Sequence, residues 1–474
     1  MINALSIEHL SFTYQSWTGK QNDPLFRGLS LQIPSGSKTL LLAPFNRGKT
    51  TLAKIICGVC PKYFPGEMDG LIRLYGKALG DLDPWDLLPV CTYVSQNPQE
   101  QFVATSVEEE IAFPLESMGM DRATMKARIE EAITHWGLQD LRTSSEQELS
   151  GGERKRVLLA TMQAIDASFW LLDEAFDDLD QHWRDQLKDL IATSNKTVLV
   201  LASRYLGEFD DLFDQVLLLD EGVVVKGETS SLLTRFAHLC GDDLPSPLER
   251  EHVLPSQRRI LSCLSLQAER SRVSTAESEH FTLEVPQFQL QSGELVTLVG
   301  PNGSGKSSFS RLLCGLDAPL GGQITIDGKQ YEGKQLSKRV GYLFQSPDLQ
   351  IFLPTVAEEL SWSLKRRSDL SRKEVEKQVA DCAELFSLDL DDTPTTMSYP
   401  LRKALQAAVY YLLDRPFYIL DELDSALTYQ SALSIIAHLR HNGAGILLIT
   451  HDRQFADKVA QRSYTIEDGR LSAV

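Results

Sequence analysis

A duplication with a long period limits how this chain can fold more than any other feature of its sequence. Residues 171–174, Leu-Leu-Asp-Glu, recur as residues 419–422, Ile-Leu-Asp-Glu, at an offset of 248 (421 − 173). Ser150 and Ser398 are separated by the same 248 residues. Because this repeat is far longer than that of a solenoid, the sequence predicts two copies of one large domain.

Short apolar runs alternate with helical stretches in each copy. In the first copy, residues 107–165 are mostly helical in pattern and are expected to form a helical subdomain. The alternation predicts an α/β fold in which a mainly parallel sheet carries helices on both faces. The runs of the first copy that we expect to be strands are residues 39–42, 93–94, 169–172, 198–201 and 216–219.

Helix-breaking residues mark the boundary between the two copies. Several prolines and a glycine lie between residues 241 and 255, where they interrupt any helix. We therefore predict a first domain at residues 1–236, a linker at 237–256 and a second domain at 257–474.

A glycine-rich loop in the second copy predicts a nucleotide site. Residues 300–307 follow the apolar run 295–299 and precede a helical pattern. In such a loop, backbone N–H groups converge on phosphate oxygens and the helix N-terminus adds partial positive charge. Lys306 would reach the β- and γ-phosphates, and the Ser307 hydroxyl would ligate Mg²⁺. The residues expected to bind the nucleotide here are Gly300, Pro301, Asn302, Gly303, Ser304, Gly305, Lys306, Ser307 and Ser308.

Composition argues against several classes of protein. The formal net charge of −18 at pH 7 disfavours a protein whose main task is to grip nucleic-acid phosphates. No apolar run is long enough to span a membrane, so any membrane attachment would come through a partner protein. The N-terminus does not resemble a secretion signal, and the 7 cysteines are expected to be reduced cytosolic thiols. Cys57 and Cys60 have zinc-like spacing but no second ligand pair, which favours buried helix residues.

The order of the motifs resembles that of ATP-binding cassette (ABC) ATPases. A phosphate loop, a glutamine, the segment Leu-Ser-Gly-Gly-Glu at 149–153 and an Asp-Glu pair follow one another. The resemblance covers nearly the whole chain, twice. It implies two tandem ABC nucleotide-binding domains that pair with each other head to tail. Each ATP would then lie between the phosphate loop of one domain and the Leu-Ser-Gly-Gly segment of the other.

One composite site matches the family pattern almost throughout, with a core from the second copy and an opposing segment from the first. In this family a Gln senses Mg²⁺ and the attacking water, a Glu positions or deprotonates that water, and a late His faces the γ-phosphate. The resemblance assigns catalysis to Glu422, Gln345 and His451, and Mg²⁺ binding to Ser307, Gln345 and Asp421. It assigns closure over the γ-phosphate to Ser150, Gly151 and Gly152, with Asp180 nearby and Glu153 in place of the usual Gln.

The other composite site departs from the pattern in both copies. Its loop has Ala43 and Asn46 where glycines are expected, and Ser203 replaces the late His. The opposing segment carries Tyr399 and Pro400 in place of glycines, and proline has no N–H to give. Because these departures fall on one site, we interpret it as a site that binds ATP but hydrolyses it slowly or not at all. Its expected ATP ligands are Gly48, Lys49, Thr50 and Thr51, and its expected Mg²⁺ ligands are Thr50, Gln96 and Asp173.

Tyr14 has two interpretations. It stands where the family has an aromatic residue that stacks on adenine, which would place it at the degenerate site. An isolated aromatic residue is as readily explained by packing in the core. The second copy has no aromatic residue in the corresponding segment, 264–268.

The segments after the two glutamines resemble those of energy-coupling factor (ECF) transporter ATPases. Residues 96–110 run from a glutamine to three glutamates, and residues 345–359 run from a glutamine to two. The resemblance implies an ATP-hydrolysing subunit of a prokaryotic importer for a vitamin or a metal ion, at the cytoplasmic face of the cell membrane. Its partners would be an integral-membrane coupling (T) protein and a small substrate-binding (S) membrane protein, with no nucleic acid. For the glutamates alone, a solvated helix start is an equal explanation.

Two other classes of function remain open. Soluble tandem ABC ATPases act on ribosomes or in DNA repair, and those on ribosomes are expected to have a long charged linker and two good Leu-Ser-Gly-Gly segments. This chain has a short linker with prolines and one such segment. A non-hydrolysing, ATP-gated scaffold is the third class, and measured turnover would separate it from the other two.

Overall fold

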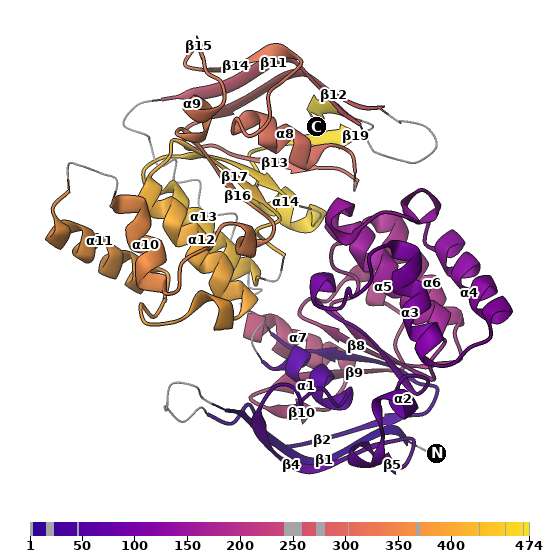
Figure 1. Ribbon diagram of the computed structural model, residues 1–474. Helices are drawn as coiled ribbons and strands as arrows, with labels where there is room; N and C mark the ends of the chain where they lie inside the picture. Colours follow the sequence, from indigo (N-terminus) through magenta and orange to yellow (C-terminus); the bar gives the residue numbers. More distant parts are fainter. Residues whose placement is uncertain are drawn as a thin grey trace. The chain divides into compact units, whose positions relative to one another are not determined.

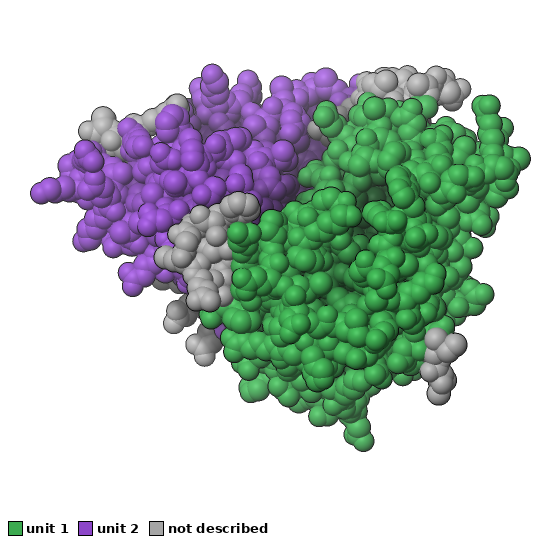
Figure 2. Space-filling view, turned by 60° about the horizontal axis from the view of Figure 1, so that its bottom comes forward, with its two compact units in different colours: residues 1–240 green, residues 241–474 purple. Residues whose placement is uncertain are grey.

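The computed structural model describes residues 3–15, 23–44, 47–240, 258–271, 280–301, 303–365, 370–425, 427–450, 452–467 and 469–473. The chain divides into two compact units, residues 1–240 and 241–474, which Figure 2 colours separately. Helix α7 (Thr229–Cys240) closes the first unit, so the predicted end of the first domain at residue 236 falls inside this helix. The rest of the predicted linker, from residue 241, lies outside the described residues.

The first unit combines an antiparallel sheet, a mainly parallel sheet and a group of helices (Figure 1). Its strands are β1 (Asn3–Tyr14), β2 (Phe26–Pro34), β3 (Lys38–Leu42), β4 (Gly66–Leu74), β5 (Lys77–Ala78), β6 (Cys91–Val94), β7 (Phe169–Asp173), β8 (Thr197–Ala202), β9 (Gln215–Asp220) and β10 (Val223–Val225). Its helices, besides α7, are α1 (Lys49–Ile56), α2 (Pro84–Leu87), α3 (Val107–Ser117), α4 (Arg122–His135), α5 (Gly151–Ile165) and α6 (Gln181–Thr193).

Helix α1 packs between the two sheets of the first unit. The larger sheet has the strand order β10-β9-β3-β8-β7-β6, in which only β10 and β9 pair antiparallel. Its central strands are buried almost throughout, as parallel strands covered on both faces should be. One face packs on α1 and the antiparallel sheet β2-β1-β4-β5, and the other packs on α3, α4, α5 and α6.

The second unit repeats this plan within one continuous sheet, ordered β15-β14-β11-β12-β20-β19-β13-β18-β17-β16. Pairing between Glu284 of β12 and Arg470 of β20 joins its antiparallel and parallel parts. Its strands are β11 (Ile260–Ser271), β12 (His280–Gln291), β13 (Leu295–Val299), β14 (Gly321–Ile326), β15 (Lys329–Gln330), β16 (Val340–Leu343), β17 (Phe417–Asp421), β18 (Gly445–Ile449), β19 (Arg462–Glu467) and β20 (Arg470–Ala473). Its helices are α8 (Lys306–Leu313), α9 (Lys334–Ser337), α10 (Val356–Leu364), α11 (Arg372–Leu385), α12 (Tyr399–Leu413), α13 (Tyr429–Arg440) and α14 (Arg453–Val459).

The predicted α/β fold class is confirmed in both units. The five apolar runs expected to be strands correspond to β3, β6, β7, β8 and β9. The predicted helical segment contains α3, α4 and α5, and α10, α11 and α12 form the equivalent group in the second unit (Figure 1). The antiparallel sheet was not predicted, because β2 alternates buried and exposed residues and so lacks a continuous apolar run.

The 7 cysteines are free in the structure, and their reduced state in the cell stays a prediction. Cys57 is the half-buried C-cap of α1 and Cys60 is buried in the turn beyond it, so the expectation of two buried cysteines within a helix is wrong. No group of three or more His, Cys, Asp and Glu side chains in the described ranges could hold a metal ion. Over the same ranges, no helix is long and apolar enough to cross a bilayer.

Candidate functional site

The glycine-rich loop of the second unit connects β13 to α8. A Cβ atom at Gly300, where φ is +155°, would lie 2.3 Å from the backbone oxygen of Ile466. Gly305 is the N-cap of α8 and has a left-handed φ of 108°. Both positions therefore require glycine, because no side chain fits the close approach or that conformation. Ser307 and Ser308 follow in the first turn of the helix.

The loop is shaped to receive an anion. Lys306 Nζ donates to the carbonyl oxygens of Gly300 and Pro301, at 2.8 Å each. The Ser304 hydroxyl is buried and has no hydrogen-bond partner among the described residues. The first N–H groups of α8 have no acceptor within the helix, and the helix N-terminus favours negative charge. These features fit a phosphate group. Of the predicted site residues, Asn302 and His451 lie outside the described part of the chain.

The acid pair of the second unit lies at the end of β17. Asp421 Oδ2 accepts hydrogen bonds from Tyr342 OH at 2.6 Å and from Ser307 Oγ at 3.4 Å. Burial and the adjacent Asp421 raise the pKa of Tyr342, so its hydroxyl stays protonated. Gln345 Nε2 donates to Glu422 Oε2 at 2.7 Å. The structure therefore brings the predicted Mg²⁺ ligands Ser307 and Asp421 together, and pairs Gln345 with Glu422.

The first unit builds the corresponding loop between β3 and α1. Gly48 is the N-cap of α1, with a left-handed φ of 89°. Lys49 Nζ donates to the carbonyl oxygens of Ala43 at 2.9 Å and Pro44 at 3.2 Å. The same Nζ atom lies 3.5 Å from Glu174 Oε1, and both side chains are buried. The lysine therefore repeats the loop contacts of the second unit, and it forms an ion pair with the glutamate of its own acid pair.

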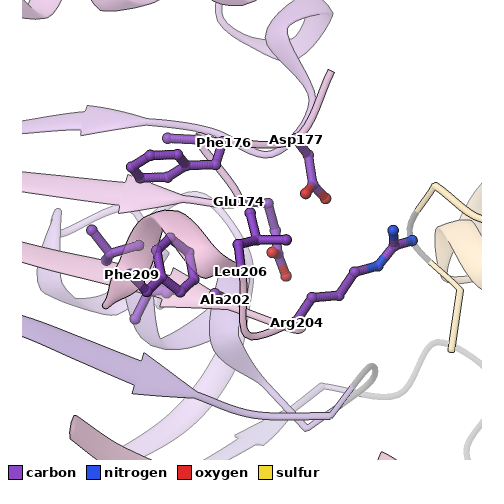
Figure 3. Close-up of a pocket in the computed structure, with 10 residues that line it drawn as sticks. Glu174, Phe176, Asp177, Ala202, Arg204, Leu206 and Phe209 are labelled. Carbon is purple, nitrogen blue, oxygen red and sulfur yellow. The ribbon is translucent and has the colours of Figure 1, made fainter. Parts of the chain in front are cut away.

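Glu174 is withdrawn into the interior of the first unit. It is 3% exposed, and its Oε2 accepts a hydrogen bond from the backbone N–H of Ser203 at 3.0 Å. Burial raises the pKa of Glu174 to about 7, while the charge of Lys49 lowers it and that of Asp177 raises it. Figure 3 shows the small pocket beside Glu174, whose lining includes Asp177 and Arg204 and, on its apolar side, Phe176, Leu206 and Phe209.

Glu174 and Glu422 share a backbone conformation but differ in their side-chain partners. Both have left-handed φ angles, 50° and 48°, which cost free energy in residues other than glycine. Their N–H groups donate to the carbonyl oxygens of Leu201 and Ile449 respectively. Glu422, however, is only half-buried, and its carboxylate is paired with the side chain of Gln345. Side-chain surroundings, rather than backbone, therefore distinguish the two sites.

The remaining predicted ligands of the first unit surround Asp173. Burial raises the pKa of Asp173, and a hydrogen bond from Thr50 and the charge of Lys49 oppose this rise. Tyr93 OH donates to Asp173 Oδ2 at 3.3 Å. Gln96 is half-buried, and its role as an Mg²⁺ ligand stays a prediction.

Tyr14 is packed against the first turn of α1. Its hydroxyl lies 3.0 Å from Thr51 Oγ1, and its ring meets that of Phe12 edge-on at a centroid distance of 4.9 Å. Burial raises the pKa of Tyr14 to about 12. These contacts favour the packing interpretation, and adenine stacking by Tyr14 stays a prediction.

The two Leu-Ser-Gly-Gly positions begin helices α5 and α12 differently. In α5, the Ser150 N–H donates to Glu153 Oε2 at 2.7 Å and the Glu153 N–H donates to Ser150 Oγ at 3.3 Å. Glu153 thereby completes a capping box, which explains why it serves in place of Gln. In α12, Ser398 forms no side-chain cap and Pro400 lies in the first turn. The approach of residues 150–152 to a nucleotide held by the second unit stays a prediction.

Several residues that support the site were not predicted. They share one property, which is that each recurs in the other copy at the offset of the motifs, 248 or 249 residues (403 − 155, 342 − 93, 359 − 110). The duplication was therefore the signal that could have found them. They are the tyrosines that donate to the acid pairs, Tyr93 and Tyr342, the buried lysines Lys155 and Lys403, and the buried glutamates Glu110 and Glu359.

Comparison with known proteins gives consistent family matches. The family model described as "ABC transporter" matches residues 26–177 and 283–425. A Treponema denticola protein, provisionally described as an ABC transporter ATP-binding protein, is 27% identical over 461 residues, which cover 94% of this chain and 92% of the relative. YkoD of Bacillus subtilis, provisionally described as an HMP/thiamine import ATP-binding protein, is 27% identical over 512 residues, covering 99% and 90%.

Solved structures match over both units. A structure of an RNase-L inhibitor has a TM-score of 0.58 at 21% identity and covers 98% of this chain and 90% of that chain. A structure of ribosome-bound archaeal Pelota and ABCE1 has a TM-score of 0.62 at 21% identity and covers 94% and 76%. At this identity the likeness concerns the fold alone.

Proposed function

Because this chain belongs to the ABC transporter family and is a tandem ABC ATPase, we propose that it is the energy-coupling subunit of an ECF-type importer. The predicted family and the ATP-hydrolysing activity are confirmed by the match of the family model to both halves. The proposal adds the partner proteins, the class of substrate that is transported, and which of the two nucleotide sites hydrolyses ATP. Its cargo would be a vitamin or a metal ion.

The second unit supplies the hydrolytic core in this proposal. The loop N–H groups and Lys306 would hold the phosphates of ATP. Ser307, Gln345 and Asp421 offer hydroxyl, amide and carboxylate oxygens, a donor set that suits Mg²⁺, which would neutralise phosphate charge when bound. Glu422, 2.7 Å from Gln345, is placed to accept a proton from the attacking water.

The first unit supplies a second nucleotide site with little or no hydrolysis. Its loop lysine and its helix N-terminus are retained, so phosphate binding is supported. Glu174, in contrast, is buried and lies 3.5 Å from Lys49, and no side chain equivalent to His451 is available, because Ser203 stands there. A carboxylate that is 3% exposed and paired with the loop lysine has little access to an attacking water.

Matching exposed apolar residues in both units carry the importer proposal. Val103 and Phe352 are 66% and 77% exposed, and Phe113 and Trp362 are each 53% exposed. The members of each pair are 249 residues apart (352 − 103, 362 − 113), as are the two motif glutamines. Large apolar side chains that recur at equivalent exposed positions favour contact with a partner protein.

Two buried glutamates fix the backbone of the loops that carry Val103 and Phe352. Glu110 Oε2 accepts hydrogen bonds from the N–H groups of Val103 and Ala104, at 2.9 Å each. Glu359 Oε2 likewise accepts from the N–H groups of Phe352 and Leu353 in the second unit. Glu110 and Glu359 are therefore buried residues that hold the loop backbone, rather than part of a solvated helix start. Because each loop also carries the motif glutamine, a partner bound there would be coupled to the nucleotide site.

In this proposal, the two surfaces bind the integral-membrane coupling (T) protein, which holds the small substrate-binding (S) protein. The chain would act at the cytoplasmic face of a prokaryotic cell membrane. The similarity to YkoD over 99% of the chain supports import of a small organic nutrient, because that relative is described as an import ATP-binding protein for HMP/thiamine.

The alternative is a soluble tandem ABC ATPase that acts on ribosomes or DNA. The likeness in fold to the RNase-L inhibitor and to ribosome-bound ABCE1 is compatible with it. The net charge of −18 and the exposed aromatic residues favour a protein partner over nucleic-acid phosphates.

Purification of the tagged chain from its native cells in mild detergent tests the proposal. We expect two integral membrane proteins to co-purify. The double variant Phe113→Asp/Trp362→Asp should lose them, because burying an unpaired carboxylate in an apolar contact is costly. Its ATPase activity as an isolated protein should remain, because neither side chain belongs to the nucleotide site.

The matched control is Trp85→Asp/Leu264→Asp, which changes one exposed apolar residue elsewhere in each unit. This control should keep both membrane proteins. Loss of the membrane proteins from both double variants, or from neither, would contradict the assigned surface. Recovery of ribosomal or DNA-repair components without any membrane protein would contradict the importer proposal and support a soluble tandem ABC ATPase.

A further inference from the structure

The residue that breaks the Leu-Ser-Gly-Gly pattern of the second unit contacts the hydrolytic core of that same unit. Tyr399 OH donates to the backbone carbonyl oxygen of Gln345 at 2.8 Å. The Gln345 side chain donates in turn to Glu422 at 2.7 Å. We propose that Tyr399 is a positioning residue, which fixes the backbone of Gln345 and so keeps its amide on Glu422. This inference rests on the proposed assignment of hydrolysis to the second unit.

The first unit shows which contact Tyr399 replaces. There, Gly151 stands at the equivalent position and has no side chain to offer. The carbonyl oxygen of Gln96 instead accepts a hydrogen bond from Lys155 Nζ at 3.1 Å. The same ammonium group donates to the carbonyl oxygen of Glu174 at 3.2 Å. One buried lysine therefore ties the glutamine motif to the acid pair in the first unit.

In the second unit the lysine is retained but its hydrogen bonds differ. Lys403 Nζ donates to the carbonyl oxygens of Glu422, Leu423 and Ser425, which belong to the acid pair and the turn after it. The carbonyl oxygen of the motif glutamine accepts from Tyr399. The acceptor is thus the same in both units, and the donor has changed. Tyr399, at the position of a glycine in the first unit, therefore supplies the contact to the glutamine carbonyl that Lys155 supplies there.

Neighbouring residues of α12 hold this arrangement in place. Lys403 lies one helical turn after Tyr399, and its Nζ atom is 5.4 Å from the centre of the tyrosine ring. The Arg402 guanidinium lies 5.7 Å from the same centre and forms a 3.1 Å ion pair with Asp348, which follows Gln345 in the loop. Two cations therefore contact the ring of Tyr399, while its hydroxyl forms a hydrogen bond with the glutamine loop.

Steady-state ATP hydrolysis by the Tyr399→Phe chain tests the inference. Removal of the hydroxyl should lower kcat about fivefold, the factor that corresponds to one hydrogen bond. The KM for ATP should stay unchanged, because the loop contacts of Lys306 are untouched. Tyr418→Phe is the matched control, since its hydroxyl also donates to a backbone carbonyl of the second unit, that of Tyr410 at 3.0 Å. This control should keep the full kcat.

A second background separates positioning from a general structural effect. In a Gln345→Ala chain, Tyr399→Phe should cause no further decrease in kcat, because the amide that it positions is absent. An equal decrease in both backgrounds, or an unchanged kcat in Tyr399→Phe alone, would overturn the inference. Glu422→Gln is measured in parallel. If it leaves turnover intact, the assignment of hydrolysis and the inference both fail, whereas if it abolishes turnover and Tyr399→Phe has no effect, only the inference fails.

Discussion

At the scale of single residues, the surroundings of the two glutamates separate the sites more clearly than the motifs do. Glu174 and Glu422 follow equivalent strands with nearly the same φ, so the duplicated backbone has the same conformation at both. Lys49 lies 3.5 Å from the carboxylate of Glu174, which is buried beside it, whereas the carboxylate of Glu422 accepts from an amide. The amide of Gln345 holds the carboxylate of Glu422, whereas burial raises the pKa of Glu174 and the charge of Lys49 only partly offsets this rise.

The raised pKa of Glu174 predicts a pH dependence of stability. Its pKa is about 7 in the folded chain, against an ordinary value of 4.5, so protonation favours the folded state. This stabilisation is complete below pH 4.5 and is lost as the pH rises through 7. Glu174→Gln stays neutral at every pH. From pH 5.5 to pH 8, its free energy of unfolding should therefore increase relative to that of the unchanged chain by on the order of 2 kcal/mol.

Urea unfolding of the nucleotide-free chain at these two pH values measures the difference. Glu228→Gln, which changes an exposed glutamate of the same unit, is the control and should show no comparable trend. A relative stability of Glu174→Gln that is independent of pH, or that falls as the pH rises, would contradict the raised pKa of Glu174.

At the scale of elements, α5 and α12 show how one duplicated helix acquired two roles. Helix α5 keeps the Ser150–Glu153 capping box and an open glycine pair, which suits a helix end that must approach a phosphate. Helix α12 has no such cap, and Leu401 stands where Glu153 would be. Its first turn instead carries Tyr399, which contacts the glutamine loop of its own unit. The departures from the motif therefore coincide with new contacts inside the second unit.

The comparison of the two helices also shows what could be predicted from the sequence. The positions of motif residues such as Lys306 and Asp421 in the fold could be predicted, because their spacing follows from a strand–loop–helix geometry, and their roles toward ATP and Mg²⁺ stay predictions. Tyr399 was recognised only as a missing glycine, because a hydrogen bond to a backbone carbonyl leaves no pattern in a sequence. The roles of Lys155 and Glu110 were missed for the same reason, since both act on main-chain groups.

At the scale of the whole molecule, the proposed asymmetry predicts unequal effects of equivalent substitutions. Glu422→Gln should lower steady-state ATP hydrolysis by about 100-fold or more, because the positioned base is lost. Glu174→Gln should leave most of the turnover, because that glutamate is buried and paired with Lys49. Each substitution is the control for the other, since both remove one charge at the same point of the repeat. Equal losses would refute the asymmetry.

The proposed pairing of the units gives a last prediction, which concerns a residue outside the hydrolytic core. Gly151→Asp changes the first turn of α5 in the first unit, while the proposed core lies in the second. If residues 150–152 close over the γ-phosphate of the ATP held by Lys306, the added carboxylate repels it, and turnover should fall by about 100-fold or more.

The equivalent change in the second unit separates this pairing from a general effect. Tyr399→Asp faces the degenerate site in the proposed pairing and removes the hydroxyl bond to Gln345, so it should cost only about fivefold. Gly80→Asp, at an open position of the first unit where a Cβ atom meets no neighbour within 4 Å, should have no effect. Comparable losses from Gly151→Asp and Tyr399→Asp would mean that the two signature positions serve equivalent sites. A large loss from Gly151→Asp alone requires that the first unit completes the site of the second, because a unit that hydrolysed ATP by itself would not depend on a glycine of the other.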